Sequence, residues 1–523
     1  MSDRQPAPGV PEYLDQSGSG VPRVRPRSLV VGVGVVGALA VAGAGTWAAM
    51  ALLGSGPQPA EALPAGTLAY LSVDLDPSAT QKIEAVRMLK KFPALDDRLG
   101  LDTSDDLRRA IYDWVQDDAG CAGLDYGRDI EPWLGARAAV AVVDAGGDTP
   151  SPVVVLSVSD ESAAEEGLAR LRGCGEATTS PSATAEGGWV VSDGWAVVAE
   201  DAEVAQEVAD AAATASLADD PTYQQWQEAV GDPGIVTMYA APAAGGSLGD
   251  LMAESGAAEG TEAGRALEDF EGMAGTVRFH DGSLQLEVVG GVGPDPLPVS
   301  DRAGAAVADL PDDTAAALGL GLAEGWSDRL VEELNALDGS ATTGQDWQDR
   351  LSKETGLTLP EDAETLLGDS TVVAMGPDLD LDALAGSTDG WEIPLGVTVH
   401  GDVAGIERVL GTLRTRLPAE AAGLLDSDTE GDAVAIGPQA DYRSRLLADG
   451  GLGDTRTFRA VVPEADRAGV VLFVDFDAGG SWLTRLTRDD PELSENLAPL
   501  SGLGVSGWLD GDVSHLQVSL TTD

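Results

Sequence analysis

The feature that most constrains the fold is an internal repeat in the part of the chain that follows residue 62. Four pairs of similar segments occur in the same order, and apolar, strand-like runs follow the first two pairs. Repetition at a long period indicates one structural unit used twice. The paired segments are 63–67 with 310–314, 129–135 with 362–368, 152–172 with 394–414, and 217–223 with 452–458.

The third pair of segments shows what one repeated unit contains. When Pro152 is aligned with Pro394, both copies give an apolar strand, an acidic residue and an apolar helical stripe. Asp160 and Asp402 stand where the helices begin, and a carboxylate there accepts hydrogen bonds from free backbone N–H groups. The pattern therefore predicts a strand followed by a capped amphipathic helix in each copy.

The end of each copy predicts a β-hairpin. Asp281-Gly282 separates two alternating apolar runs in the first copy, and Asp510-Gly511 does so in the second. Asp-Gly pairs favour tight hairpin turns. Hairpins combined with strand-then-helix units are typical of α+β folds and not of a doubly wound parallel sheet.

An uncharged segment precedes the repeat. Leu29–Leu53 contains no charged residue and follows Arg23, Arg25 and Arg27. A bilayer core is crossed by roughly 20 apolar helical residues, and positive charge before such a segment favours a cytoplasmic N-terminus. A cleaved secretory signal is the alternative, although its apolar core usually has only about 7–15 residues. Both interpretations place the remainder of the chain outside the cytoplasm.

The predicted fold class is α+β, with an N-terminal single transmembrane helix followed by two similar α+β copies that have mainly antiparallel sheets. The expected location is the cell membrane, crossed once, with the C-terminal domains extracytoplasmic. The predicted organisation is a disordered cytoplasmic tail over 1–28, a transmembrane helix over 29–53, a linker over 54–62, the first copy over 63–295 and the second copy over 296–523.

Residues 63–93 read LPAGTLAYLSVDLDPSATQKIEAVRMLKKFP, and residues 129–135 read DIEPWLG. These motifs resemble an uncharacterised domain-of-unknown-function family of membrane-anchored proteins from high-GC Gram-positive bacteria. The resemblance covers nearly everything after the uncharged segment. It implies a location and a class of protein, and it implies no catalytic residue.

The charge balance excludes one class of partner. The chain has 88 acidic and 31 basic residues and a net charge of −57. Broad nucleic-acid binding needs a basic surface, so we expect no nucleic-acid partner. The 43% of hydrophobic residues is enough for folded domains and too much for a disordered acidic tail.

The two cysteines, Cys121 and Cys174, both lie in the first copy. An extracytoplasmic location permits a disulfide between them, and two free thiols are the alternative. Two cysteines alone do not make a structural zinc site, which usually needs four ligands.

One segment matches a hydrolase motif. Residues 245–249 read GGSLG, which fits the G-x-S-x-G nucleophile elbow with Ser247 as the nucleophile. His280 or His400 would have to serve as the base. The second copy has no counterpart, and motifs of this kind arise by chance in a glycine-rich chain.

Alternating carboxylates suggest a calcium loop. Asp378, Asp380 and Asp382 are followed by Asp389, but Ala383 stands where such a loop needs glycine. A solvated acidic loop is the simpler interpretation.

We therefore assign no catalytic, cofactor-binding or metal-binding residue, expect no cofactor, and expect a protein that is not an enzyme. The expected function is a non-enzymatic binding or scaffolding module at the outer face of the cell membrane, with a groove between the copies. Two alternatives stay open, an extracytoplasmic serine hydrolase that uses Ser247 and a calcium-stabilised adhesive protein. The expected partners are the lipid bilayer through residues 29–53 and a cell-envelope protein, lipid or wall component.

Overall fold

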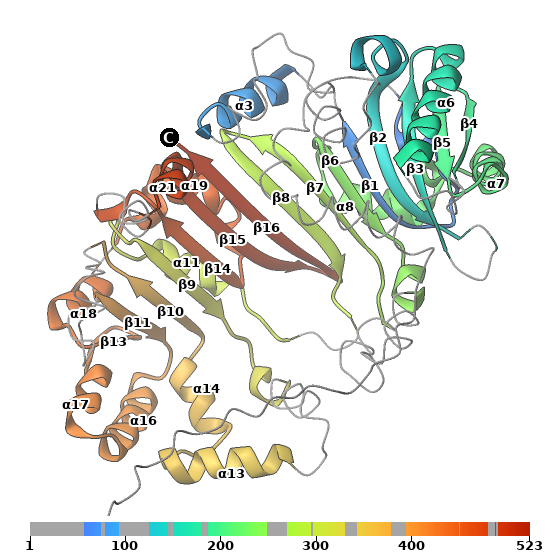
Figure 1. The fold of residues 1–523 in the computed structure, drawn as a ribbon. Coiled ribbons are helices and arrows are strands. Elements are labelled where there is room, and N and C mark those ends of the chain that lie inside the picture. Colours follow the sequence, from blue (N-terminus) through green and yellow to red (C-terminus); the bar gives the residue numbers. More distant parts are fainter. Residues whose placement is uncertain are drawn as a thin grey trace, which may run out of the picture. The chain divides into compact units, whose positions relative to one another are not determined.

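The structure is a computed structural model of the chain (Figure 1). Contacts divide the chain into two units, Met1–Ala44 and Gly45–Asp523, and every described residue belongs to the second unit. The described residues are 57–74, 79–93, 125–144, 146, 150–178, 187–247, 269–293, 297–329, 343–377, 394–448, 450–479, 487 and 490–523.

The described strands fall into two sets along the chain. The first set is β1 (Thr67–Asp74), β2 (Leu134–Val143), β3 (Ser151–Val158), β4 (Gly188–Ser192), β5 (Trp195–Ala199), β6 (Val236–Ala240), β7 (Met273–His280) and β8 (Ser283–Gly291). The second set is β9 (Ala316–Gly321), β10 (Ser370–Met375), β11 (Leu395–His400), β12 (Ser427–Glu430), β13 (Ala433–Ile436), β14 (Val470–Asp475), β15 (Leu500–Asp510) and β16 (Val513–Thr522).

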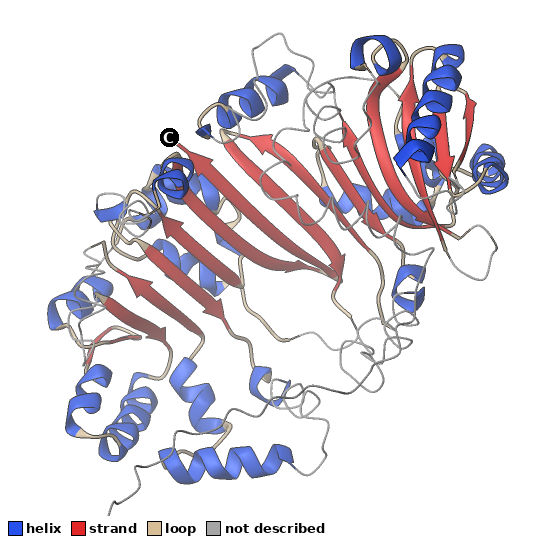
Figure 2. Cartoon of the chain, in the orientation of Figure 1, coloured by secondary structure: helices blue, strands red, loops and turns tan. Residues whose placement is uncertain are grey.

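Along the chain, each described α-helix lies between two strands (Figure 2). The α-helices are α3 (Ala79–Leu89), α6 (Glu161–Thr178), α7 (Ala202–Thr214), α8 (Pro221–Val230), α11 (Arg302–Ala308), α13 (Thr343–Thr355), α14 (Glu361–Leu367), α16 (Val403–Arg416), α17 (Ala419–Ala422), α18 (Ala440–Leu447), α19 (Arg456–Val461) and α21 (Pro491–Leu497). The single-turn 3-10 helices are η2 (Pro59–Ala62), η4 (Leu217–Asp219), η5 (Gly423–Leu425), η6 (Leu452–Asp454) and η7 (Ala465–Arg467), and η3 (Tyr126–Ile130) is a short π-helix.

All of these strands form one 16-stranded sheet, in the order β12-β13-β11-β10-β9-β14-β15-β16-β8-β7-β6-β1-β2-β3-β5-β4. Each neighbouring pair whose register is known is antiparallel, including β8 with β16 at the centre. Outward from this junction the order is the same on both sides. We call β1 to β8 the first half of the sheet and β9 to β16 the second half, so that β8 corresponds to β16 and β1 to β9.

The predicted fold class was wrong on two points. In the part of the chain that the structure describes, no helix is long and apolar enough to cross a membrane. The predicted span, Leu29–Leu53, lies outside that part. The strands form a single continuous sheet instead of separate sheets, because β8 and β16 would otherwise each leave a long row of unpaired backbone groups at an edge.

One face of the sheet, the core face, carries Tyr70 and Val289 in the first half and Ala317 and Phe473 in the second. Helices α7 and α8 pack on it in the first half, and α11, α18 and α19 pack on it in the second. Alternation of buried and partly buried positions along the strands follows from this one-sided cover.

The opposite face, the open face, carries Leu71 and Val277 in the first half and Leu318 and Leu472 in the second. Helices α6 and α16 cover it only near the outer strands of the two halves. Helix α3 covers it over β7, near the centre of the sheet (Figure 1).

The predicted hairpins are β7–β8 and β15–β16. Asp281 and Gly282 have φ values of 49° and 81°, the left-handed pair that a type I′ turn requires. Gly511, in the second hairpin, has a φ of 61°. Asp510 pairs with Val513, so the two turn residues of the second hairpin are Gly511 and Asp512, one position later than the predicted Asp510-Gly511. The two tight turns fix the register of the two hairpins whose strands meet at the junction.

Candidate binding surface

Several of the residues that the sequence singled out lie outside the described part of the chain. Cys121 lies outside the described residues, and Cys174 falls within the range of α6, so their disulfide stays a prediction. The suggested calcium loop also lies outside the described part, with Asp378, Asp380, Asp382 and Asp389. Within that part, no group of three or more His, Cys, Asp or Glu side chains is arranged to hold a metal ion.

Ser247 does not stand on a nucleophile elbow. Residues 243–247 are helical, and the Ser247 hydroxyl donates to the Ala243 carbonyl oxygen at 3.5 Å, the spacing of one helical turn. An elbow instead presents its serine at a strained turn between strand and helix. His280 lies at the end of β7, where its Nε2 is 3.6 Å from a carboxylate oxygen of Asp281.

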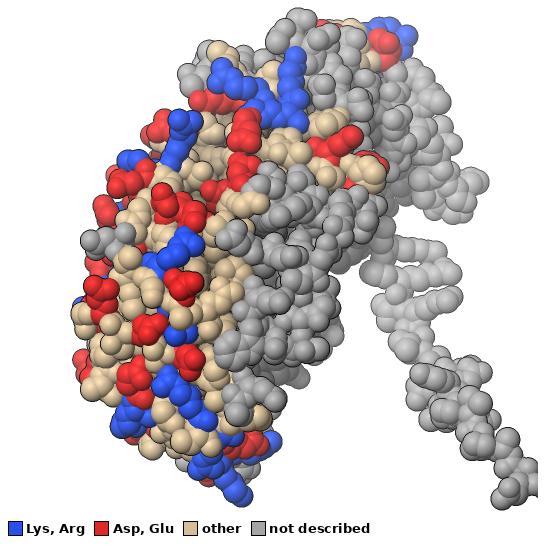
Figure 3. Space-filling model, turned by 90° about the vertical axis from the view of Figure 1, so that its left-hand side faces the viewer, with Lys and Arg blue, Asp and Glu red and all other residues tan. Residues whose placement is uncertain are grey.

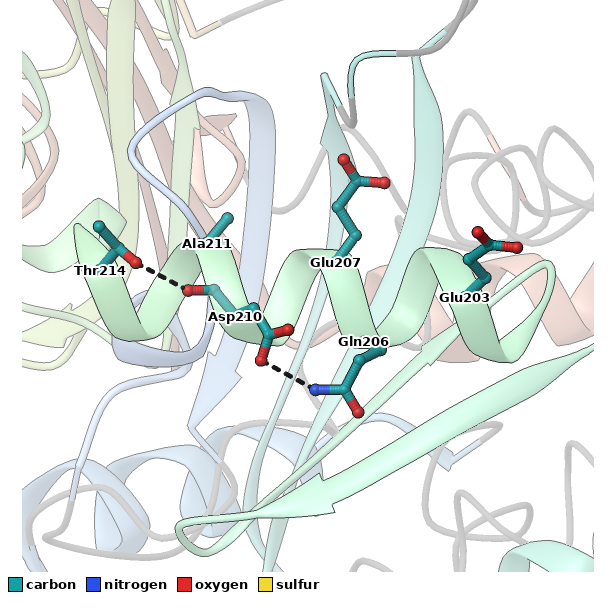
Figure 4. A pocket seen from close by; sticks show the side chains of 6 residues that line it. All are labelled: Glu203, Gln206, Glu207, Asp210, Ala211 and Thr214. Carbon is teal, nitrogen blue, oxygen red and sulfur yellow. Dashed lines mark hydrogen bonds between the residues drawn. The ribbon is translucent and has the colours of Figure 1, made fainter.

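Among the described residues, a depression on the surface of α7 is lined by side chains of that helix (Figure 4). Gln206 donates to Asp210 at 2.9 Å, and the Thr214 hydroxyl donates to the Asp210 carbonyl oxygen at 3.0 Å. Glu203 and Glu207 stand beside them. These are ordinary contacts between neighbours on one helix face, and they do not identify a ligand.

A buried aspartate occurs at the same place in both halves, just before β2 and β10. Asp129 accepts from the Asp125 backbone N–H at 2.9 Å, and Asp362 accepts from the Thr358 backbone N–H at 2.7 Å. Arginines of the next helices, Arg170 on α6 and Arg408 on α16, complete each site. The two aspartates therefore fasten α6 to η3 and α16 to α14, the segments that lead into β2 and β10.

These bonds shift the ionisation of both aspartates. A hydrogen bond from Arg128 is the largest cause that holds the pKa of Asp129 far below its ordinary value. The Thr358 backbone N–H, with Arg408, lowers the pKa of Asp362. A lowered pKa is typical of a carboxylate whose charged form accepts hydrogen bonds. Both aspartates therefore have a structural role.

The two halves meet by strand pairing and not by a groove. Ser283–Gly291 pairs with Val513–Thr521 along β8 and β16. The groove that the sequence led us to expect between the copies is therefore replaced, among the described residues, by a continuous ladder of backbone hydrogen bonds.

A chain of charged and aromatic side chains crosses this junction. We call it the central cluster, and it consists of Arg278, Glu287, Trp508, His515 and Arg467. Arg278 donates to Glu287, and His515 Nδ1 lies 3.4 Å from the other carboxylate oxygen. The Trp508 and His515 rings are stacked at 4.8 Å, and the Arg467 guanidinium lies 4.8 Å above Trp508.

The central cluster joins α8 to the sheet. Arg278 Nη1 donates to the carbonyl oxygens of Val230 and Asp232, each at 3.3 Å, at the C-terminal end of α8. A cation is favourable there because the last carbonyls of a helix lack partners within it. Burial alone would raise the pKa of Glu287, but the His515 hydrogen bond and the Arg278 charge more than offset this and lower it.

Three polar groups near the central cluster have no hydrogen-bond partner, in the part of the chain that is described. They are the hydroxyls of Ser506 and Ser519 and the indole N–H of Trp508, and all three are buried. Buried polar groups are normally paired, so these three groups are exceptions within the described junction.

The open face of the second half is the most exposed apolar surface on the described sheet. Four exposed side chains lie on its strands toward the junction, with 41% of Leu318, 37% of Val470, 41% of Leu509 and 45% of Leu516 accessible to solvent. Val373 on β10 and Leu395 on β11, on the same face farther out, are 36% and 42% exposed. Elsewhere, as Figure 3 shows for one side of the molecule, acidic and basic side chains are interspersed. Clustered apolar exposure of this kind on a folded protein marks a contact surface.

With the geometry established, comparison with known proteins assigns the chain to a family. A family profile described as "Protein of unknown function (DUF3352)" matches residues 28–391. The chain belongs to this family. The match confirms the expected domain of unknown function. The bacterial source that the resemblance implied is a finer statement and stays a prediction.

Other comparisons add little to the DUF3352 assignment. No curated protein matches the chain. Among solved structures, the one titled "Structure of crystal form III of TP0453" matches with 8% sequence identity and a TM-score of 0.22, over 46% of this chain and 82% of that chain. A likeness this small supports no conclusion about the DUF3352 chain.

Sequence reasoning missed both the central cluster and the exposed surface of this DUF3352 protein. Arg278 and His515 are far apart in sequence, and each reads as an ordinary residue of a strand. The repeat did carry one usable signal. Leu71 and Leu318 follow their matched Leu-Pro segments at the same spacing, so the sequence marks them as equivalent positions. Whether a helix covers one and not the other is then a question that the repeat raises.

Proposed function

We propose that this DUF3352 protein is a non-enzymatic binding or scaffolding protein at the outer face of the cell membrane. The observation that carries the proposal is the exposed apolar surface on the open face of the second half, formed by Leu318, Val470, Leu509 and Leu516. A binding protein needs a surface that gains free energy when water leaves it, and apolar area supplies about 25 cal/mol per Å².

The position of this surface supports a binding role. Leu318 and Val470 lie on β9 and β14, and Leu516 lies on β16, so the surface spans the interior of the sheet and not a frayed edge. Residues on paired strands keep fixed spacings, which makes the surface a rigid template for a ligand.

The proposed location is supported by the sequence alone. The uncharged run at Leu29–Leu53 follows three arginines, as in exported chains. Protease added to intact cells should therefore degrade residues 63–523 without lysis. Protection of these residues until the cells are lysed would contradict the location.

The binding role can be tested by replacing single residues with a photo-crosslinking amino acid in cells. We expect crosslinked adducts from position 516, and none from position 424. Leu424 is the matched control, because it is 37% exposed but belongs to η5 and not to the sheet. Equal crosslinking at both positions, or none at position 516, would show that the exposed surface binds nothing.

A further inference from the structure

We infer that the open face of the second half is a docking site for a cationic amphipathic helix of a partner protein, which occupies the place that α3 occupies in the first half. The inference rests on the proposed function and names its partner class. We call the surface the second-half site. It consists of Leu318, Leu320, Val470, Leu472, Leu509 and Leu516.

The strand registers show which residues correspond. In the first half Leu71 pairs with Met238. In the second half Leu318 pairs with Leu472 across the equivalent strands. Leu320 pairs with Val470 two residues further along, on the same face. The second-half site therefore repeats the apolar pairs on which α3 packs.

Cover is what differs between the two halves. In the first half Val236 and Phe279 are each only 3% exposed, and they form one cluster with residues of α3. Their counterparts by register are Val470 and Leu509, which are 37% and 41% exposed. Phe279 and Leu509 correspond because each stands one pair before the residues that close its hairpin.

Helix α3 shows what kind of helix fits. It buries Ala85, Met88 and Leu89, which have the spacing of one helix face, and Phe92, just after the helix, packs against the same cluster. Arg87 lies on the solvent side of α3. A partner helix with cations on its outer side suits a chain of net charge −57, since opposite charge favours association.

A backbone contact distinguishes a peptide partner from a lipid. Gln81 of α3 donates to the Phe279 carbonyl oxygen at 2.5 Å and accepts from the Phe279 backbone N–H at 2.8 Å. Among the described residues, no side-chain hydrogen bond reaches the backbone of Leu509. A side-chain amide on the partner helix can bond there in the same two-sided way, whereas an acyl chain cannot.

The second-half site is also roomier than the site under α3. Gly507 holds the position of Val277, and Ser514 holds that of Leu284. A Cβ added at Gly507 would come no closer than 3.7 Å to the His515 carbonyl oxygen and 3.9 Å to Val470 Cβ. The partner helix therefore carries a bulkier apolar side chain at this point than α3 does.

The α3 sequence itself is a suitable probe. A fluorescent peptide of residues 79–93, ATQKIEAVRMLKKFP, is titrated against the full-length chain and followed by fluorescence anisotropy. We expect saturable binding that is about tenfold weaker with Leu318→Glu and with Leu516→Glu, and unchanged with the matched control Leu424→Glu. Circular dichroism shows that each variant is folded.

A second peptide tests the backbone contact. A peptide with the Gln81→Ala change should bind the wild-type chain more weakly, by about fivefold, because it lacks the amide. Binding of the parent peptide that is unaffected by Leu318→Glu and Leu516→Glu would overturn the inference.

Other occupants give different results. If the peptide does not bind and Leu516→Glu instead abolishes binding to phosphatidylglycerol vesicles, the occupant is lipid. If Leu516→Glu instead converts a dimer to a monomer, the occupant is a second copy of the chain. Either result overturns the helix and leaves the proposed function standing, whereas an absence of adducts at position 516 in cells removes the proposed function itself.

Discussion

Glu287 of β8 and Gln517 of β16 face each other across the junction and hold equivalent positions in the two halves. Each lies four residues after the first residue of its strand, and they form the middle pair of the ladder. The axis that relates the halves therefore passes between a carboxylate and an amide. The same chain position is acidic in one half and neutral in the other, so the central cluster is asymmetric.

Replacing Glu287 with alanine should destabilise the junction. It leaves Arg278 buried without its carboxylate, and breaking a buried ion pair from one side costs about 3 kcal/mol. Urea unfolding followed by tryptophan fluorescence measures the change. The matched control is Glu203→Ala, because Glu203 is exposed on α7. Equal stability of the two variants would mean that the central cluster does not stabilise the fold.

The stability supplied by Asp362 should depend on pH. Its pKa is lowered in the folded chain, so its contribution is present above the unfolded pKa of about 3.9 and is lost as pH falls through the folded value. We expect Asp362→Asn to lower the free energy of unfolding by about 1.5 kcal/mol at pH 7. The difference in free energy of unfolding between the variant and the wild type should become smaller below about pH 4. A gap that is constant from pH 7 to pH 3 would contradict this.

Replacing Gly282, the second residue of the turn between β7 and β8, with alanine should destabilise the fold. Gly282 has a φ of 81°, and alanine in that conformation costs about 1 kcal/mol. Gly66→Ala serves as the control, since a Cβ added at Gly66 meets no atom within 4 Å. Chemical unfolding measures the free energy of unfolding of both variants. An equal loss in the two would show that a side chain at position 282 does not strain the turn.

The predicted disulfide can be tested directly. Peptide mapping without reducing agent should recover a fragment that joins Cys121 to Cys174. Replacing both with serine should lower stability by about 4 kcal/mol, the chain-entropy value for a loop of this length. Free thiols in the purified, unreduced chain would show that the bridge does not form.

Local patterns predicted local structure well. Asp160 accepts from the Ala163 backbone N–H at 3.0 Å, as a residue at a helix start should. Asp402 stands before α16 but makes no such bond with its side chain, because position alone does not fix a rotamer. The Asp281-Gly282 hairpin was predictable because few other residue pairs accept its backbone angles.

The arrangement across the sheet could not be predicted in this way. Nothing local in Ser283–Gly291 says that it pairs with Val513–Thr521 and not with another strand. The pairing is decided by which edges stay open once each half has formed. Leu318 of the second-half site is 41% exposed, and no described helix covers it as α3 covers Leu71, although the two positions have similar local sequence.

The β8–β16 pairing also bears on self-assembly. It uses up the inner edge of both halves, so the described sheet ends at β12 and β4. Both are short, and β12 carries Asp428 and Glu430. Short edge strands are poor templates for strand addition, and the acidic residues of β12 disfavour it further at that edge. A chain with so many strands is thereby kept from growing end to end into fibrils.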